Sequence, residues 1–312
     1  MFYLERHKIF DRPNERSSHI RPTLRGGGLG LVPVILMAWL IVAWLMQTSA
    51  PSSQLQYLGW VIFGAVILAV VSWRDDIISQ PPLARLFIQI SITGLIVWSA
   101  LPSEPVFQGL LPRWLDQLLS LLIWVWFINL FNFMDGIDGL AGLETICIGL
   151  GIAILGMANH VGAINGLYGL TIAAAAIGFL RWNWHPAKIF LGDVGSIPLG
   201  FLLGWLLLRL ASEGAWAAAL ILPLYYFVDT TLTLVRRIIR KQKVWEPHRS
   251  HFYQQAVNDG LSHGSVTLII GGFNIILMAL ALYSIFSPFV ALGIAIASTT
   301  VLLIWFQRRS RK

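Results

Sequence analysis

The chain has 312 residues, of which 56% are hydrophobic and only 12% charged, and it contains one cysteine, Cys147. A soluble domain carries about twice that charged fraction. These values exclude a water-soluble domain, a disordered chain and a secreted disulfide scaffold. The formal net charge of +7 leaves nucleic acid as a partner until the positions of the basic residues are considered.

Apolar runs of 16 to 22 residues recur along the chain, and each can cross a bilayer core of roughly 30 Å. We therefore predict an all-α integral membrane protein, a single polytopic domain over residues 1–312 with about ten spans. An even number of spans places both termini on one side of the membrane. The predicted spans are 28–47, 55–73, 83–101, 117–134, 139–158, 162–181, 196–211, 215–235, 265–286 and 288–307.

The basic residues are distributed unequally between the two predicted sides. Twenty of the 22 Lys and Arg residues lie on the side that holds segment 1–27, loop 236–264 and the C-terminal tail; Arg113 and Arg209 are the exceptions. Cationic residues near span ends are retained in the cytoplasm, so we predict that this side is cytoplasmic. Topology and anionic headgroups then explain the basic excess, and no nucleic-acid partner is expected. Segment 1–27 lacks the apolar core of a cleavable signal peptide.

Five polar clusters from distant parts of the chain fall on this predicted cytoplasmic side. They are Asp75 with Asp76, Asp135 with Asp138, Asp193, His248 with His251, and His19. The opposite loops hold Glu104, Asp116, Glu213 and His160 without clustering. Because scattered loop polarity would not favour one side, we predict a functional site at the cytoplasmic surface.

The segment Asn132–Gly142, NFMDGIDGLAG, carries two of these acids. Asp135 and Asp138 would share a face if the segment were helical. Asp138 would then cap the fifth span, whose N-terminal amides favour an anion nearby. An ordinary Asp/Gly helix start is the plainer interpretation.

The segment Phe190–Ser196, FLGDVGS, precedes the seventh span. Glycines at a helix N-terminus expose amides that bind phosphate, and Asp193 offers the kind of carboxylate that Mg²⁺ uses together with substrate oxygens. A glycine turn with an Asp cap is equally compatible with the sequence.

The remaining clusters are less specific. Asp75 and Asp76 cannot face the same way on a helix, so we expect distinct roles unless they form a solvated loop end. His248 and His251 lack the cysteine partners of a zinc site, and their loop, which includes Arg249, suggests cationic contacts to phosphate or a solvated basic loop.

Two further features stand apart from these clusters. Gly26–Gly28 lacks the Lys-Ser/Thr of a P-loop and is interpreted as a flexible entry to the first span, with Arg21 and Arg25 available for phosphate or lipid headgroups. Asp229 lies inside the eighth span, where an acid is either a functional group or the structural partner of a residue such as Arg236.

The strings PNERSSHIRPTLRGGG (13–28), RDDI (74–77), NFMDGIDGLAG (132–142), PAKIFLGDVGS (186–196) and PHRSHFYQ (247–254) occur in this order between apolar spans. Together they resemble the polyprenyl-phosphate N-acetylhexosamine-1-phosphate transferases, the glycosyltransferase family 4 membrane enzymes that include MraY and WecA. The resemblance covers about residues 11–265. The PNERSSH and HRSHFYQ forms look most like the WbpL-type branch, which initiates O-antigen or related surface-glycan synthesis.

The resemblance implies transfer of an N-acetylamino-sugar 1-phosphate from a UDP-sugar to undecaprenyl phosphate in the bacterial inner membrane. UMP is released, and Mg²⁺ (or Mn²⁺) is the expected cofactor. By the resemblance, Asp193 is the Mg²⁺ ligand and Asp75 the base near the lipid phosphate, with Asp76 beside it. The other implied site residues line the nucleotide and metal region (Asn132, Asp135, Asp138), contact uracil (Asn183, Phe190), or contact the sugar diphosphate (His248, Arg249, His251).

Two departures from the family pattern are visible. WecA-like members usually have another membrane helix before the PN-x-R segment, and the motif here is His-x-x-His rather than a histidine-rich triplet. The alternative function is a secondary transporter or flippase, which would place ionisable residues near the bilayer midplane. The sequence leaves open the sugar, direct attack or a covalent aspartyl-phosphate route, and a homodimer.

Overall fold

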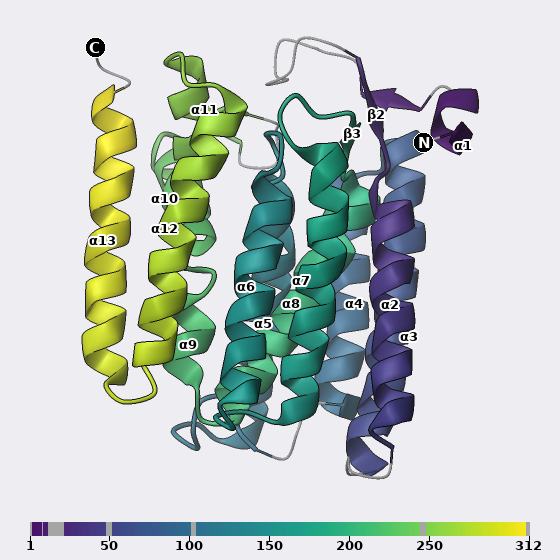
Figure 1. The fold of residues 1–312 in the computed structure, drawn as a ribbon, viewed down its shortest axis with the longest axis vertical. Helices are drawn as coiled ribbons and strands as arrows, with labels where there is room; N and C mark the ends of the chain where they lie inside the picture. The colour runs from purple at the N-terminus through teal and green to yellow at the C-terminus, as the bar shows by residue number, and fades with distance from the viewer. Residues whose placement is uncertain are drawn as a thin grey trace.

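The computed structural model describes residues 2–7, 9–11, 22–47, 52–100, 104–243 and 248–309. His19 and Arg21 lie outside these ranges. Long helices run from one end of the molecule to the other (Figure 1). They are α2 (Gly28–Leu45), α3 (Ser52–Ile77), α4 (Pro82–Ala100), α5 (Arg113–Phe133), α6 (Leu140–Met157), α7 (Ala163–Asn183), α8 (Asp193–Ser212), α12 (His263–Tyr283) and α13 (Pro288–Arg309). Among the described residues, nine helices are long and apolar enough to cross a membrane, which confirms a polytopic membrane protein.

The predicted eighth span, 215–235, is wrong as a continuous helix. It consists of α9 (Trp216–Ile221) and α10 (Leu224–Ile239), with Pro223 at the N-cap of α10. Proline has no N–H to donate and clashes with the preceding turn, so it separates the two helices. Together α9 and α10 still lead from one end of the bundle to the other, and the two described ends of the chain lie at the same end (Figure 1).

A small sheet accompanies the helices at that end of the bundle. Strand β2 (Thr23–Arg25) pairs antiparallel with β1 (Phe10–Asp11) and parallel with β3 (Ile189–Phe190). The short helix α1 (Phe2–Arg6) supplies Leu4, which packs with Leu24 and Ile189 in a separate apolar cluster. The pairing puts Arg25 opposite Phe190, three residues before Asp193. We call this end of the bundle the sheet end.

Helix α8 forms the centre of the bundle. Every residue from Val194 to Ser212 is buried. Glycines on α8 let its neighbours approach closely, because a Cβ at Gly204 would lie 2.5 Å from the indole of Trp124 on α5. A Cβ at Gly28 would lie 2.3 Å from Gly195. Gly28 is therefore a close packing point between α2 and α8, and the prediction of a flexible entry there is wrong.

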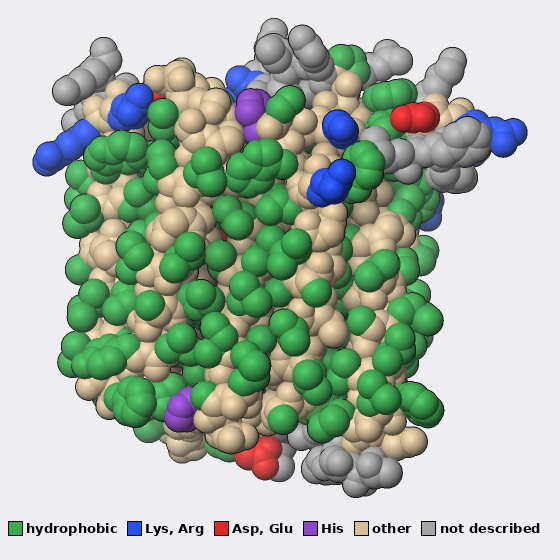
Figure 2. All heavy atoms as spheres, in the orientation of Figure 1, with side chains coloured by type: hydrophobic (Ala, Val, Ile, Leu, Met, Phe, Trp, Pro, Cys, Tyr) green, Lys and Arg blue, Asp and Glu red, His purple; other side chains and the backbone are tan. Residues whose placement is uncertain are grey.

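The surface follows the pattern expected for a bilayer. Hydrophobic side chains cover the middle of the face drawn in Figure 2, and Lys and Arg side chains lie near the sheet end. Trp44 on α2 is 66% exposed and Phe289 on α13 is 78% exposed. Such exposure of large apolar side chains suits contact with lipid tails rather than with water.

Candidate active site

Asp193, the first residue of α8, stands at the centre of a charged cluster at the sheet end. Its Oδ1 accepts hydrogen bonds from Arg25 Nη2 at 2.9 Å and from Asn132 Nδ2 at 3.1 Å. Its Oδ2 accepts from Arg85 Nη1 at 3.2 Å. The three donors come from β2, α5 and α4, so the fold brings distant parts of the sequence to one carboxylate.

Asp75 and Asp76 lie in the last turn of α3 rather than in the loop that the sequence predicted. Asp76 accepts hydrogen bonds from the backbone N–H groups of Asp193 (3.1 Å) and Val194 (2.9 Å), and pairs with Arg25 at 2.8 Å. It is thus the anion at the positive N-terminus of α8. Asp75 pairs instead with Arg85 at 2.6 Å. The two acids therefore have different partners, and their distinct roles stay a prediction.

Asp135 lies on a non-helical turn directly after α5 and is half-buried. Burial, followed by the negative charges of Asp193 and Asp76, raises the pKa of the Asp135 carboxyl well above its usual range, although Arg25 opposes the shift. Four carboxylates (Asp75, Asp76, Asp135, Asp193) thus share the cluster with two guanidinium groups (Arg25, Arg85). When all are ionised the balance is −2, which a divalent cation would neutralise.

Asp138 faces a different set of partners from Asp135. Its Oδ2 lies 2.7 Å from His185 Nδ1 and accepts the Ala187 N–H at 3.1 Å, while its Oδ1 lies 3.2 Å from His263 Nδ1. The predictions that Asp138 caps the fifth span and shares a helical face with Asp135 are wrong. The N-cap of α6 is Gly139, with φ of 78° and no side-chain cap, because the segment turns too sharply to be helical.

These contacts connect the Asp138 turn to the segment that carries Asp193. Asn183 Oδ1 accepts the Gly139 N–H at 3.0 Å, and Asn183 Nδ2 donates to the Ile189 carbonyl at 2.9 Å. Thr267 on α12 donates to the Asp138 carbonyl at 2.8 Å. The hydrogen bonds to the Asp138 carboxylate outweigh its burial and lower its pKa. Asp138 and Asn183 therefore position two loops of the site relative to each other.

Asp229 is fully buried on α10 and organises the His248–His251 loop. Oδ1 accepts from His251 Nδ1 at 3.2 Å, from the Phe252 N–H at 3.1 Å and from Thr233 Oγ1 at 3.3 Å. Oδ2 accepts from Tyr225 Oη at 3.1 Å and from the Tyr253 N–H at 3.2 Å. Asp229 thus satisfies the free amides at the start of α11 (Phe252–Asn258).

The Asp229–Arg236 pair, one of the two alternatives that the sequence left open, is not the contact that either residue makes. The Arg236 guanidinium lies over the Phe252 ring at 4.8 Å and donates to Gln307. The hydroxyl of Tyr253 donates to the Phe133 carbonyl at 3.0 Å. Helix α11 is therefore attached to the turn that carries Asp135, and the His248–His251 loop adjoins the charged cluster.

Within that loop, the two candidate histidines have different surroundings. His251 is buried, and its ring stacks on that of His248 with centroids 5.0 Å apart. Burial and the nearby charges of His251 and Arg237 lower the pKa of His248 to about 4, so His248 is neutral at neutral pH. Arg249 Nε is buried and has no hydrogen-bond partner among the described residues. Arg249 is therefore the candidate in this loop for the cationic contact to phosphate that the sequence suggests.

Several residues of the site were missed by sequence reasoning. Arg85, His185 and His263 all lie on the predicted cytoplasmic side. Arg85 is near the start of the span 83–101, His185 is in the loop before FLGDVGS, and His263 comes just before the span 265–286. Their position on that side was the available signal. Spacing alone does not reveal that Arg85 meets Asp193 or that two distant histidines meet Asp138.

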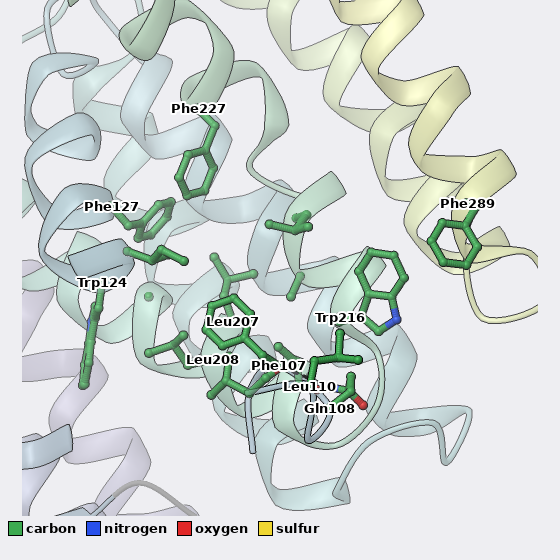
Figure 3. A pocket seen from close by; sticks show the side chains of 16 residues that line it. Phe107, Gln108, Leu110, Trp124, Phe127, Leu207, Leu208, Trp216, Phe227 and Phe289 are labelled. Carbon is green, nitrogen blue, oxygen red and sulfur yellow. Dashed lines mark hydrogen bonds between the residues drawn. The ribbon is translucent and has the colours of Figure 1, made fainter. Parts of the chain in front are cut away.

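An apolar cavity lies further down the bundle, between α5, α8 and the α9–α10 pair. Its volume is about 380 Å³, and its walls include Trp124, Phe127, Leu207, Trp216 and Phe227 (Figure 3). Gly204, which also lines it, follows Asp193 by 11 residues on α8. At about 1.5 Å per residue, Gly204 lies roughly 16 Å from Asp193 along α8.

Residues 58–211 match the model of glycosyl transferase family 4. The "Probable undecaprenyl-phosphate N-acetylglucosaminyl 1-phosphate transferase" of Bacillus subtilis is 29% identical, over 83% of this chain and 73% of that protein. The decaprenyl-phosphate N-acetylglucosaminephosphotransferase of Mycolicibacterium smegmatis is 30% identical, over 83% of this chain and 71% of the relative. The phospho-N-acetylmuramoyl-pentapeptide-transferase of Moorella thermoacetica is 33% identical over 40% of this chain and 38% of that protein.

The chain belongs to glycosyl transferase family 4. The family resemblance inferred from the motifs is thereby confirmed. The matched region contains Asp75, Asp76, Arg85, Asn132, Asp135, Asp138 and Asp193. The charged cluster described above is therefore the candidate active site of a membrane transferase.

Proposed function

We propose that this transferase moves an N-acetylhexosamine 1-phosphate from a UDP-sugar to a polyprenyl phosphate, giving a polyprenyl diphosphate sugar and UMP. One observation carries the proposal: Asp193 lies between Arg25 and Arg85 at the first turn of α8, where two phosphate-bearing substrates and a cation would meet. The names of the full-length relatives favour N-acetylglucosamine as the sugar and a C55 or C50 polyprenyl phosphate as the acceptor. More specifically, we propose that the reaction initiates O-antigen or other surface-glycan synthesis, as in the WbpL-type branch.

Mg²⁺ fits the donor set of the charged cluster. The four carboxylates exceed the two guanidinium groups by two charges, and burial together with the charges of Asp193 and Asp76 raises the pKa of Asp135. Hard oxygen ligands of this kind suit Mg²⁺, which takes one or two carboxylates plus substrate oxygens. Asp193 and Asp135 would hold the ion. When bound, it would act as a Lewis acid on the phosphoryl oxygens of the donor diphosphate.

The basic side chains of the cluster would bring the two anionic substrates together. Arg25 and Arg85 are each partly exposed, with 32% and 36% of the side chain accessible, so they can exchange a carboxylate contact for a phosphate contact. In the proposed reaction an oxygen of the lipid phosphate attacks the β-phosphorus of the donor. The bond from that phosphorus to the bridging oxygen breaks, and UMP leaves with the electron pair.

Asp75 would orient the acceptor phosphate or remove its remaining proton. Its partner Arg85 also contacts Asp193, so the acceptor site and the proposed metal site share one guanidinium. We propose direct attack over a covalent aspartyl-phosphate route, because each carboxylate of the cluster already has another role: Asp193 and Asp135 would hold the ion, Asp75 would meet the acceptor, and Asp76 is bonded by the Asp193 and Val194 amides. Phosphorylated protein formed with the donor alone would support the covalent route instead.

The apolar cavity suits the hydrocarbon chain of the acceptor. It is lined by aromatic and aliphatic side chains (Figure 3), and a polyprenyl chain whose phosphate lies at Asp75 is long enough to reach it. The predominance of Lys and Arg at the sheet end favours a cytoplasmic location for that end. We therefore place the proposed active site at the cytoplasmic face of a bacterial inner membrane, where a water-soluble UDP-sugar has access.

The experiment is UMP release by purified protein in detergent, with undecaprenyl phosphate, Mg²⁺ and each UDP-sugar in turn. We expect release that requires both the lipid and the metal, with UDP-N-acetylglucosamine as the best donor. Asp193→Asn should abolish release. Glu213→Gln is the control, because Glu213 accepts the Gly162 N–H and an Asn165 amide hydrogen at the C-terminal end of α8, away from the charged cluster. No release with any donor would favour a transporter or flippase.

A further inference from the structure

A second hollow lies between α2 and α7 at the sheet end, on the side of β2 away from the charged cluster. Its volume is about 910 Å³, and we call it the α2–α7 groove. Leu29, Val34 and Phe179 give it apolar walls, and Gly30 and Gly178 give it an open floor. A Cβ built on either glycine meets no atom within 4 Å, so the groove has room for an apolar chain.

Basic side chains border the groove at its sheet end. Trp182, which is 43% exposed, lines the groove, and the Lys188 ammonium lies over its indole ring at 5.5 Å. Arg181 is exposed and directly precedes Trp182. Figure 2 shows Lys and Arg side chains above the apolar middle of this face. The groove thus has an apolar body and a basic, aromatic rim at the depth where lipid headgroups lie.

We propose that the α2–α7 groove binds a glycerophospholipid with an anionic headgroup, such as phosphatidylglycerol. One acyl chain lies along Gly30 and Gly178, and the phosphate lies near Lys188 and Arg181. Lysine and arginine near a membrane surface each favour an anionic lipid by about 1 kcal/mol, or roughly fivefold. The occupied groove supports β2 and β3, because Gly26, Gly27 and Ile189 also line it.

A second copy of the chain fits the groove less well. Copies in one membrane are related by an axis along the bilayer normal, which brings equal depths together. The basic rim of one copy would then face the basic rim of the other, and like charges disfavour that contact. An anionic amphiphile meets the same rim with the opposite charge.

The acceptor substrate is also an anionic amphiphile, but its phosphate has to reach the charged cluster. The Arg25 guanidinium is directed to Asp76 and Asp193, and none of the cluster's carboxylates lines the groove among the described residues. A phosphate held at Lys188 is therefore separate from the proposed reaction.

The test measures bound lipid on delipidated protein titrated with phosphatidylglycerol or phosphatidylcholine and analysed by native mass spectrometry. We expect phosphatidylglycerol to bind more tightly, by roughly 25-fold for two basic residues. The double variant Arg181→Gln, Lys188→Gln should remove that preference. Gly178→Leu should weaken phosphatidylglycerol binding by about tenfold, the effect of withdrawing roughly two methylene contacts.

Gly272→Leu is the matched control, because Gly272 lies on α12 and its Cβ would also meet nothing within 4 Å. It should bind phosphatidylglycerol as the wild type does. Thermal melting of Gly178→Leu in detergent shows whether this variant is folded, and the lipid measurement itself requires no donor. The lipid proposal and the proposed function can therefore each fail without the other.

Three outcomes would overturn the proposal. One is equal binding of the two phospholipids by the wild type, and another is unchanged phosphatidylglycerol binding in Gly178→Leu. The third is a different occupant, seen either as undecaprenyl phosphate displacing phosphatidylglycerol from the groove or as a dimer that Gly178→Leu dissociates.

Discussion

Asp229→Asn tests whether one buried carboxylate holds the His248–His251 loop in place. The Asp229 carboxylate accepts five hydrogen bonds, two of them from the Phe252 and Tyr253 amides that begin α11. An asparagine of nearly the same shape keeps one accepting oxygen and replaces the other with a donating NH₂ group. At least one of the donors that now meet Asp229 must then lose its partner.

The less costly arrangement places the new NH₂ group at the present Oδ2. The Tyr225 hydroxyl can rotate to accept a hydrogen bond, but the Tyr253 N–H cannot. A buried donor without a partner costs about 1–3 kcal/mol, and loss of the charge at the remaining bonds adds roughly 1 kcal/mol. We expect local opening of α11 to become easier by about 2–4 kcal/mol, or roughly 30- to 700-fold.

The assay is amide hydrogen exchange of peptides that cover 251–258, combined with the donor KM for UMP release. Amide exchange should accelerate by roughly 30- to 700-fold if local opening of α11 limits the exchange rate. The KM for the UDP-sugar should also rise, because the loop adjoins the charged cluster. Glu213→Gln is the control and should leave exchange of 251–258 unchanged. Wild-type exchange over 251–258 in Asp229→Asn would refute the reasoning.

Three other variants test the charged cluster and the loop beside it. Asp193→Asn should abolish UMP release while the protein stays folded by thermal melting, and near-normal activity would contradict the metal assignment. Asp135→Asn should lower UMP release yet raise the Tm of metal-free protein, because it removes a carboxyl whose pKa is raised by burial and by Asp193 and Asp76; a lower Tm would count against this charge balance. In the wild type without metal, the stability due to Asp135 is present below its ordinary pKa of 3.8 and is lost as pH rises through the raised value. His248 has the opposite sign: its pKa falls from 6.5 to about 4, so the stability it contributes is lost as pH falls through that window. The Tm should change less with pH between about 4 and 6.5 in His248→Asn than in the wild type. An unchanged dependence of Tm on pH would exclude His248 as the cause of the wild-type loss.

Composition and hydropathy alone identify the class of the molecule. Apolar runs of membrane length identify spans because a chain in hydrocarbon must satisfy its backbone groups within helices. Local motifs made Asp193 and Asp135 candidates, since glycine-rich turns at helix ends have recognisable chemistry, and the family resemblance added Asn132. Pro223 marked the break in the eighth span, but an apolar run of sufficient length concealed it.

The tertiary structure decided which carboxylates share a site. Asp135 and Asp138 are three residues apart, yet one lies in the charged cluster and the other is bonded by His185 and His263. The sequence left Asp229 open as a functional acid or the structural partner of an arginine, and the structure shows it bonded to the amides that begin α11. Asp193 on α8 and Arg25 on β2 are 168 residues apart in the chain, yet they form one ion pair. Local spacing cannot specify such pairs, because helix packing around α8 sets which side chains come within about 3 Å of one another.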